Sequence, residues 1–171
     1  MATTRQVSIG GTSKVELQAA LAAEHVAMNA TAEQLFASSL FTVSPTPSSL
    51  PTLQCTVREV GCPDGATMPE IIAAAGQRGL AACPAELGPH LRLQYLDQPE
   101  GRRGKPVLAQ RAPYGSVTIV SNRLSDDDTF PRGFYLRRID DVLWLRGYRS
   151  NDDHVWDPDD QLVFTEDPSC A

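Results

Sequence analysis

The spacing of hydrophobic positions changes along the chain, from a helical period near the N-terminus to strict alternation further on. Ser13 and Glu16 form a capping box, the pattern that opens a helix, so we predict a helix over residues 14–25. Thr31 begins a similar pattern, which predicts a second helix over residues 30–39; a single bent helix is the alternative. The buried stripe of the first helix is expected to comprise Val15, Leu17, Ala20 and Leu21.

A proline-rich stretch separates these helices from the next elements. Prolines lack a backbone donor and restrict the residues before them, so residues 44–51 are predicted to form a surface loop. Residues 53–60 then alternate between apolar and polar side chains, which is typical of a half-buried strand. Thr67 and Glu70 form another capping box and Gly79 suits a helix end, which predicts one further helix between them.

The second half of the chain is predicted to be rich in strands. We expect single strands at residues 91–96, 105–111, 116–122 and 162–164, and a tight hairpin of residues 133–139 and 142–148. The sequence therefore predicts an α+β domain, with N-terminal helices and one further helix packed on a mostly antiparallel sheet formed largely by residues 91–165. Its predicted parts are a flexible N-terminus (1–12), a single domain (13–165) and an acidic C-terminal tail (166–171).

The predicted hairpin has one face that carries candidate ligand-binding residues. If Asp140 and Asp141 form its turn, Tyr135 lies opposite Arg146, Arg137 lies opposite Trp144, and Tyr148 extends the same face. The opposite, core face carries Phe134, Leu136, Leu143 and Leu145. Aromatic rings stack on planar ligands and guanidinium groups bind carboxylates or phosphates, so the polar face is suited to a planar or anionic ligand. The alternative is a second packing layer in which arginine stems cover the rings.

A second group of candidates lies in residues 80–99. On the predicted strand that follows the two prolines, Arg92, Gln94 and Gln98 would form the opposite wall of a ligand pocket. Glu86 and His90 are candidate catalytic residues, because a carboxylate beside an imidazole can act as a general acid/base pair. We do not expect them on one regular helix, because prolines punctuate the segment. In the alternative interpretation Glu86 caps a helix or pairs with Arg92, and His90 is a surface residue.

Charge and composition exclude several classes of protein. The 171 residues carry a net charge of −6, which disfavours binding to nucleic acid or to anionic membranes. Residues 91–149 have a local balance of +4, and residues 150–171 one of −7. No stretch is apolar enough to span a membrane, and no apolar run follows the N-terminal charge, so we expect a cytoplasmic protein.

No metal or cofactor site is expected. The histidines are far apart and no cysteine pair has zinc spacing. Phosphate-loop, dinucleotide-binding and serine-hydrolase motifs are absent. Free thiols are expected outside secretory compartments, and a disulfide between Cys62 and Cys83 is left open.

Three segments resemble a family of small uncharacterised bacterial proteins. They are CPAELGPHLRLQYLDQP at residues 83–99, PDGAT at residues 63–67 and GFYLRR at residues 133–138. The resemblance extends over about residues 30–165. It implies a bacterial, cytosolic origin and one compact domain, and it carries no activity, ligand or catalytic residue with it.

Two hypotheses on function follow. The first is a small-molecule pocket between the hairpin face and the wall formed by Arg92, Gln94 and Gln98, with binding or catalysis both open. The second is a protein-interaction module, a regulator or inhibitor, that docks a basic partner through the acidic residues 150–171. The sequence does not decide the oligomeric state.

Overall fold

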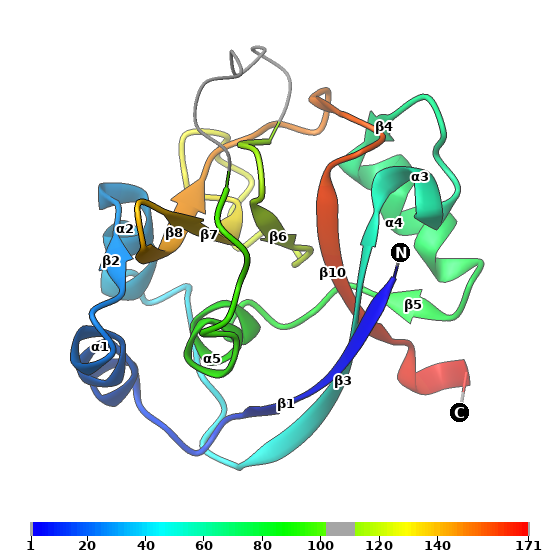
Figure 1. The fold of residues 1–171 in the computed structure, drawn as a ribbon. Helices are drawn as coiled ribbons and strands as arrows, with labels where there is room; N and C mark the ends of the chain where they lie inside the picture. The colour runs from blue at the N-terminus through cyan, green and yellow to red at the C-terminus, as the bar shows by residue number, and fades with distance from the viewer. Residues whose placement is uncertain (1, 102–111, 171) are drawn as a thin grey trace.

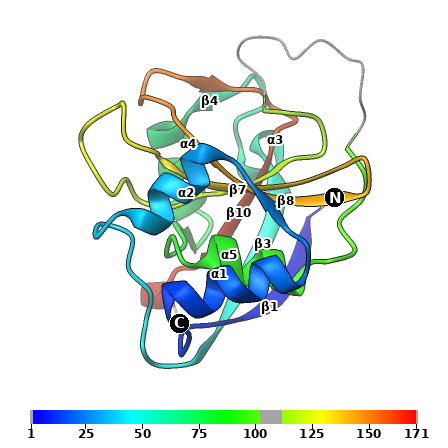
Figure 2. The ribbon, with the colours of Figure 1, turned by 90° about the vertical axis from the view of Figure 1, so that its left-hand side faces the viewer.

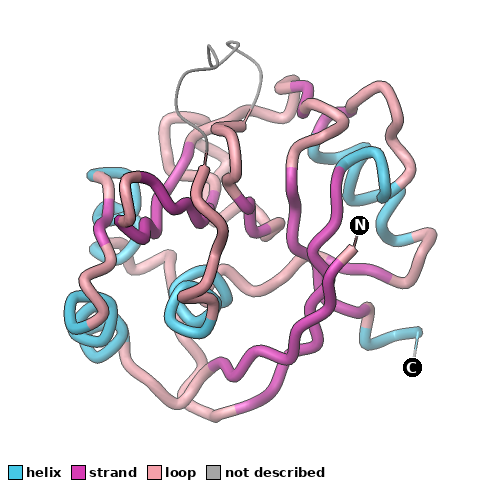
Figure 3. The backbone as a smooth tube through the Cα atoms, viewed as in Figure 1, coloured by secondary structure: helices cyan, strands magenta, loops and turns pink. Residues whose placement is uncertain are grey.

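The computed structural model describes residues 2–101 and 112–170, and within them the strands form one large sheet and one small ribbon. The strands are Thr3–Ile9 (β1), Ala27–Met28 (β2), Ser48–Thr56 (β3), Ala66–Thr67 (β4), Leu80–Ala81 (β5), Val117–Ile119 (β6), Gly133–Ile139 (β7), Val142–Tyr148 (β8), Val155–Trp156 (β9) and Gln161–Glu166 (β10). The large sheet follows the order β1-β3-β10-β6-β7-β8-β2, with β5 paired to one end of β10, and β4 pairs with β9 alone. Figure 3 shows the curved path of the strands.

The sheet is mixed but mostly antiparallel. Within the described residues, only the pairs β10–β6 and β8–β2 run parallel. The helices are Lys14–Ala23 (α1), Ala30–Ala37 (α2), Val57–Val60 (α3), Met68–Gly76 (α4) and Leu87–Gln94 (α5), and a short 3-10 helix (η1) covers Pro168–Cys170. The predicted α+β class is therefore confirmed.

The helices divide between two sides of the sheet, and each side has its own hydrophobic core. Helices α1, α2 and α5 gather on one side and α3 and α4 on the other (Figure 1), and the first group faces the viewer in Figure 2. Strand β10 serves both cores because successive side chains of a strand point to opposite faces. Val163 packs with the first helix group, whereas Leu162 and Phe164 pack with the second.

The predicted helix starts are largely confirmed. Ser13 and Glu16 form the expected capping box of α1, and Thr67 and Glu70 form that of α4. Two helices rather than one bent helix occupy residues 14–37, separated by β2. The N-cap of α2 is Asn29 and not Thr31, and its side chain accepts a hydrogen bond from the Ala32 N–H.

The prediction of a flexible residue range 1–12 is wrong. Residues Thr3–Ile9 form β1, which pairs with the whole of β3 and buries Val7 and Ile9. The predicted loop 44–51 is likewise shorter than expected, because β3 already begins at Ser48. Pro51 is tolerated there because it lies one position beyond the last β10 partner of β3, where β3 has a free side.

Two further strand predictions are wrong because helices replace strands. The predicted strand 53–60 ends at Thr56, whose side chain and that of Glu59 form a capping box that starts α3. The predicted strand 91–96 is mostly α5. There, Leu87 and Leu91 are four residues apart and both fully buried, so the helical period overrides the apparent alternation. Pro89 is accommodated because the first helical turn has no backbone acceptors for its N–H groups.

The hairpin is confirmed in full register, with Ile139 opposite Val142 and Tyr135 opposite Arg146. Of the remaining predicted strands, 116–122 corresponds to β6, and 105–111 lies outside the described residues. The short strand expected at 162–164 is the longer β10, which lies between β3 and β6. The sheet therefore draws its strands from both halves of the chain, more widely than the predicted range 91–165.

Candidate functional site

The outer face of the hairpin, defined by Tyr135, Arg137, Trp144, Arg146 and Tyr148, lies opposite the core face as predicted. Phe134, Leu136 and Leu145 on the core face are almost completely buried. On the outer face, the Arg146 guanidinium lies 4.9 Å from the centre of the Trp144 ring and 6.0 Å from that of Tyr135. These distances are those of cation–π contacts, so the predicted alternation of arginines and aromatic rings is present.

The ring system continues from the outer face onto the β4–β9 ribbon. Tyr135 and Tyr148 lie 6.3 Å apart between ring centres, Tyr148 and Trp156 lie 5.8 Å apart, and His154 and Trp156 lie 5.2 Å apart. All three pairs meet edge to face, the arrangement that aromatic quadrupoles favour. Four rings from three separate parts of the chain thus hold one another in place.

These four rings line a cavity of about 170 Å³, which we call the aromatic cavity. Its other lining residues are Ala112, Pro113, Thr118, Arg149 and Ser150. The lining residues lie on or directly after strands β6, β7 and β8, in residues 112–113 and in the segment around β9. The lining is aromatic and apolar with a few polar atoms, which is the usual composition of a small-molecule site.

Two polar atoms of the cavity residues are buried without a hydrogen-bond partner within the part of the chain that the structure describes. They are the indole Nε1 of Trp156 and the hydroxyl of Ser150. Trp156 is 96% buried, so its indole is shielded from bulk solvent. A buried donor without a partner costs about 1–3 kcal/mol, and such atoms in native proteins call for an explanation.

Burial also keeps the titratable groups of the cavity neutral. It raises the pKa of the Tyr148 phenol to about 12, although the nearby charge of Arg132 acts in the opposite direction. Burial lowers the pKa of His154 below its ordinary value. At neutral pH the cavity therefore presents a neutral imidazole and a neutral phenol, and its charge comes from arginine.

Arg92 and Gln98, predicted as ligand-binding residues, instead form a buried structural network. Arg92 is completely buried and donates to Gln98 Oε1 at 2.5 Å and to the Tyr95 carbonyl. Gln98 in turn donates to the carbonyls of Gly115 at 3.0 Å and Leu136 at 3.3 Å. Through Gln98, these hydrogen bonds connect Arg92, near the end of α5, to the backbone of β7. Burial lowers the pKa of Arg92 to about 10, which leaves it charged at neutral pH.

Gln94 binds the edge of the sheet. Its side chain accepts a hydrogen bond from the Ser8 N–H at 2.9 Å and donates to the Ser8 carbonyl at 2.8 Å. The amide thus pairs with β1 as a neighbouring strand would. Because α5 packs in the core on the opposite side of the hairpin from Tyr135 and Arg146, the predicted pocket between these two sets of residues is not formed.

Glu86 and His90, the candidate catalytic pair, are one turn apart at the start of α5, with Glu86 as its N-cap residue, contrary to the expectation that no regular helix brings them together. Glu86 Oε2 accepts a hydrogen bond from the Ser44 N–H at 3.1 Å, and His90 Nε2 accepts one from the Gly10 N–H at 3.2 Å. The two side chains are 3.7 Å apart. Burial lowers the pKa of His90 although Glu86 opposes this effect, so the imidazole is neutral. His90 thus holds the loop at Gly10, and Glu86 holds the loop at Ser44.

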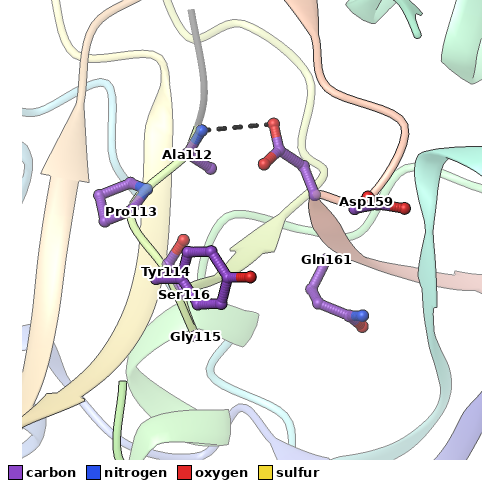
Figure 4. A pocket seen from close by; sticks show the side chains of 8 residues that line it. Ala112, Pro113, Tyr114, Gly115, Ser116, Asp159 and Gln161 are labelled. Atoms are coloured by element: carbon purple, nitrogen blue, oxygen red, sulfur yellow. Dashed lines mark hydrogen bonds between the residues drawn. The ribbon is translucent and has the colours of Figure 1, made fainter. Parts of the chain in front are cut away.

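Besides a cavity of about 510 Å³ that Glu166 helps to line, two cavities larger than the aromatic cavity contain carboxylates. One of about 380 Å³ is lined by Glu86, Ser44, Asn122 and the buried Cys83, whose thiol pKa is raised by burial, so that no thiolate nucleophile is present. The other, also about 380 Å³, lies between residues 112–116 and the chain around Asp159 and Gln161 (Figure 4). There the Asp160 carboxylate accepts hydrogen bonds from the N–H groups of Ala112 and Asp157.

The acids of residues 150–171 are largely engaged inside the fold. Asp152 forms ion pairs with Arg123 and Arg132, and Asp160 is 96% buried. Asp167 accepts hydrogen bonds from Ser169 in η1. Strand β10, which occupies a central position in the sheet, connects this acidic region to the core.

The described residues show neither a disulfide, nor a cluster suited to a metal ion, nor a helix suited to crossing a membrane. Cys55, Cys62 and Cys83 are free, so the disulfide left open between Cys62 and Cys83 is not formed. Residues 2–101 and 112–170 contain no group of three or more His, Cys, Asp or Glu side chains arranged to hold a metal ion. None of the helices described is both long and apolar enough to cross a bilayer.

Sequence reasoning identified two of the four rings of the cavity, Tyr135 and Tyr148, and missed His154 and Trp156. Both lie in the acidic residues 150–171, for which the sequence suggests docking of a basic partner. The available signal was a large aromatic residue, Trp156, within a polar segment, where burial against another element is the usual explanation. Comparisons with protein-family models, with curated proteins and with solved structures found no match.

Proposed function

We propose that this protein binds a small planar molecule in the aromatic cavity. The observation that carries the proposal is the buried Trp156 Nε1–H, a donor without an acceptor in the wall of a cavity built from four rings. A ligand with one acceptor atom would satisfy this donor and stack on the rings at the same time. The bacterial, cytoplasmic setting expected from the sequence is part of the proposal.

The size of the cavity limits the ligand. Cavities of about 150 Å³ accept benzene, so the volume of about 170 Å³ fits one six-membered ring with a small substituent. The edge-to-face contacts fix the walls before a ligand arrives, which reduces the entropy cost of binding. The proposal is one of binding. Catalysis is not proposed, because the Ser150 hydroxyl in the lining makes no hydrogen bond to His154 that would activate it.

The indole N–H of Trp156 provides the test. The chain has two tryptophans, and Trp144 does not line the cavity, so a Trp144→Phe variant leaves a single indole N–H signal in a ¹H–¹⁵N NMR spectrum. Single-ring probes such as phenol and benzamide are expected to shift this signal in a saturable way. Filling the cavity through Ala112→Leu in the same background should abolish the shift.

The control is Ala73→Leu, the same change at an exposed position of α4. It should leave the titration unchanged. The proposal is wrong if no probe shifts the Trp156 signal, or if the shift persists when the cavity is filled, since binding would then occur elsewhere.

A further inference from the structure

Three arginines on or beside the outer face have no acidic partner. Arg58, Arg123, Arg132 and Arg138 each pair with a carboxylate, whereas no carboxylate among the described residues pairs with Arg137, Arg146 or Arg149. The donors of Arg149 go to neutral oxygens of Thr129, Thr31 and Gln34. Arg5, Arg78 and Arg92 also lack a carboxylate partner among the described residues, but Arg137, Arg146 and Arg149 lie together on or beside one face of the hairpin.

The unpaired arginines also have unsatisfied donors. The Nε atoms of Arg137 and Arg146 are buried and have no hydrogen-bond acceptor within the described chain, as is also true of those of Arg132 and Arg138, whose charges are nevertheless paired with carboxylates. Burial lowers the pKa of Arg137, and the neighbouring charge of Arg146 acts in the same direction, although Tyr135 opposes both. Two like charges held side by side with unfilled donors are an arrangement that an anion stabilises.

The register places Arg146 beside a wall of the aromatic cavity. Arg146 lies directly opposite Tyr135, which lines the cavity, and its guanidinium lies 6.0 Å from the centre of that ring. Arg137 lies opposite Trp144, one step further toward the turn on the same face. Arg149 also lines the cavity, but its guanidinium donates to Thr31 and Gln34 of α2 and to the Thr129 carbonyl. A ring seated in the cavity beside Tyr135 therefore has the Arg146 guanidinium as its neighbouring cation.

We infer that the ligand of the aromatic cavity is an anion, a single-ring compound whose carboxylate or phosphate group binds Arg146 while its ring occupies the cavity. This inference rests on the function proposed above and adds the charge and the orientation of the ligand. The same arginines exclude ammonium compounds, although aromatic walls alone would favour them. The bidentate fork of arginine suits both carboxylate and phosphate, because each presents two oxygens that can accept two parallel hydrogen bonds.

The test compares four probes of similar size by titration of the Trp156 indole N–H signal in the Trp144→Phe protein. Benzoate and phenyl phosphate carry the anion, benzamide is the neutral analogue of benzoate, and benzylamine is the cation. We expect the better anion to bind at least about tenfold more tightly than benzamide, as a charge-assisted hydrogen bond predicts, and benzylamine to bind most weakly. Whichever anion binds more tightly identifies the acidic group of the ligand.

Arg146→Gln in the same background should remove the preference for the anion while leaving the affinity for benzamide unchanged. The matched control is Arg138→Gln, which makes the same charge change on the same hairpin at a residue paired with Glu100 and Asp141. It should retain the preference. Equal affinities for benzoate, phenyl phosphate and benzamide, or an equal loss in both variants, would overturn the inference and leave the proposed binding function intact. If no probe binds, both fail.

Discussion

The side chain of Gln98 holds the fully buried guanidinium of Arg92 at 2.5 Å and connects it to the backbone of β7. Neither residue faces solvent, so this pair stabilises the fold rather than contacting a ligand. A buried charge that loses its partner is costly, because the remaining group cannot regain its hydration. Gln98 therefore carries more stability than its neutral side chain would suggest.

Gln98→Ala is expected to lower the free energy of unfolding by about 3 kcal/mol, since it leaves a buried guanidinium N–H without an acceptor. The double variant Arg92→Met/Gln98→Leu should be less destabilised than Gln98→Ala alone, because it removes the charge together with its partner. Urea denaturation measures both. Gln77→Ala, at an exposed position after α4, is the control and should change little. A Gln98→Ala protein as stable as the control would contradict the structural role.

Gly147 and Gly76 form a matched pair for a test of packing. A Cβ atom on Gly147 would lie 2.7 Å from the Thr31 carbonyl carbon and 2.8 Å from the Ala32 nitrogen, both backbone atoms at the start of α2. Gly147→Ala should therefore push β8 away from α2 and cost about 1–3 kcal/mol. A Cβ on Gly76 meets nothing within 4 Å, so Gly76→Ala should be neutral or stabilise helix α4 by about 0.5–1 kcal/mol. Thermal unfolding of the wild-type protein and both variants measures the two changes in stability. Equal effects would contradict the close approach of β8 and α2.

The hairpin could be predicted from the sequence because its determinants are local, whereas α5 and the cavity depend on distant contacts. The alternation of residues 133–148 and the turn at Asp140 specify the register by themselves. In α5, Leu91, Leu93 and Tyr95 also alternate, and only packing against other elements selects the helix. Trp156 reaches the cavity through the pairing of β9 with β4, which lie about 90 residues apart in the chain and share no local signal.

Buried histidines make stability depend on pH. Burial lowers the pKa of His90 in the folded protein below the value of about 6.5 that it has when unfolded. Between these two pKa values the unfolded state binds more protons, so stability falls as the pH falls from about 6.5 and is fully present above it. His154 acts in the same direction. His90→Gln keeps an acceptor for the Gly10 N–H and should reduce this pH dependence.

Urea unfolding of the wild-type protein, His90→Gln and His154→Gln between pH 5 and 7.5 would show the contribution of each histidine. The expected result is a shallower slope in each single variant and the shallowest slope in the double variant. A His90→Gln slope equal to that of the wild-type protein would mean that the folded state binds the proton of His90 as readily as the unfolded state does.

The two turn residues of the hairpin have the left-handed backbone conformation, with φ of 51° at Asp140 and 61° at Asp141. Glycine adopts this conformation freely and β-branched residues do so only with strain, so stability should fall in the order Asp141→Gly, wild type, Asp141→Val. The valine variant is expected to lose about 1–2 kcal/mol. The lost ion pair with Arg138 contributes little to either change, because Asp141 is almost fully exposed.

Asp153→Val removes the same charge at another exposed loop position, where φ is not positive, and should leave the urea midpoint nearly unchanged. A valine at position 141 that is tolerated as well as one at position 153 would show that the turn is not held in this conformation in solution.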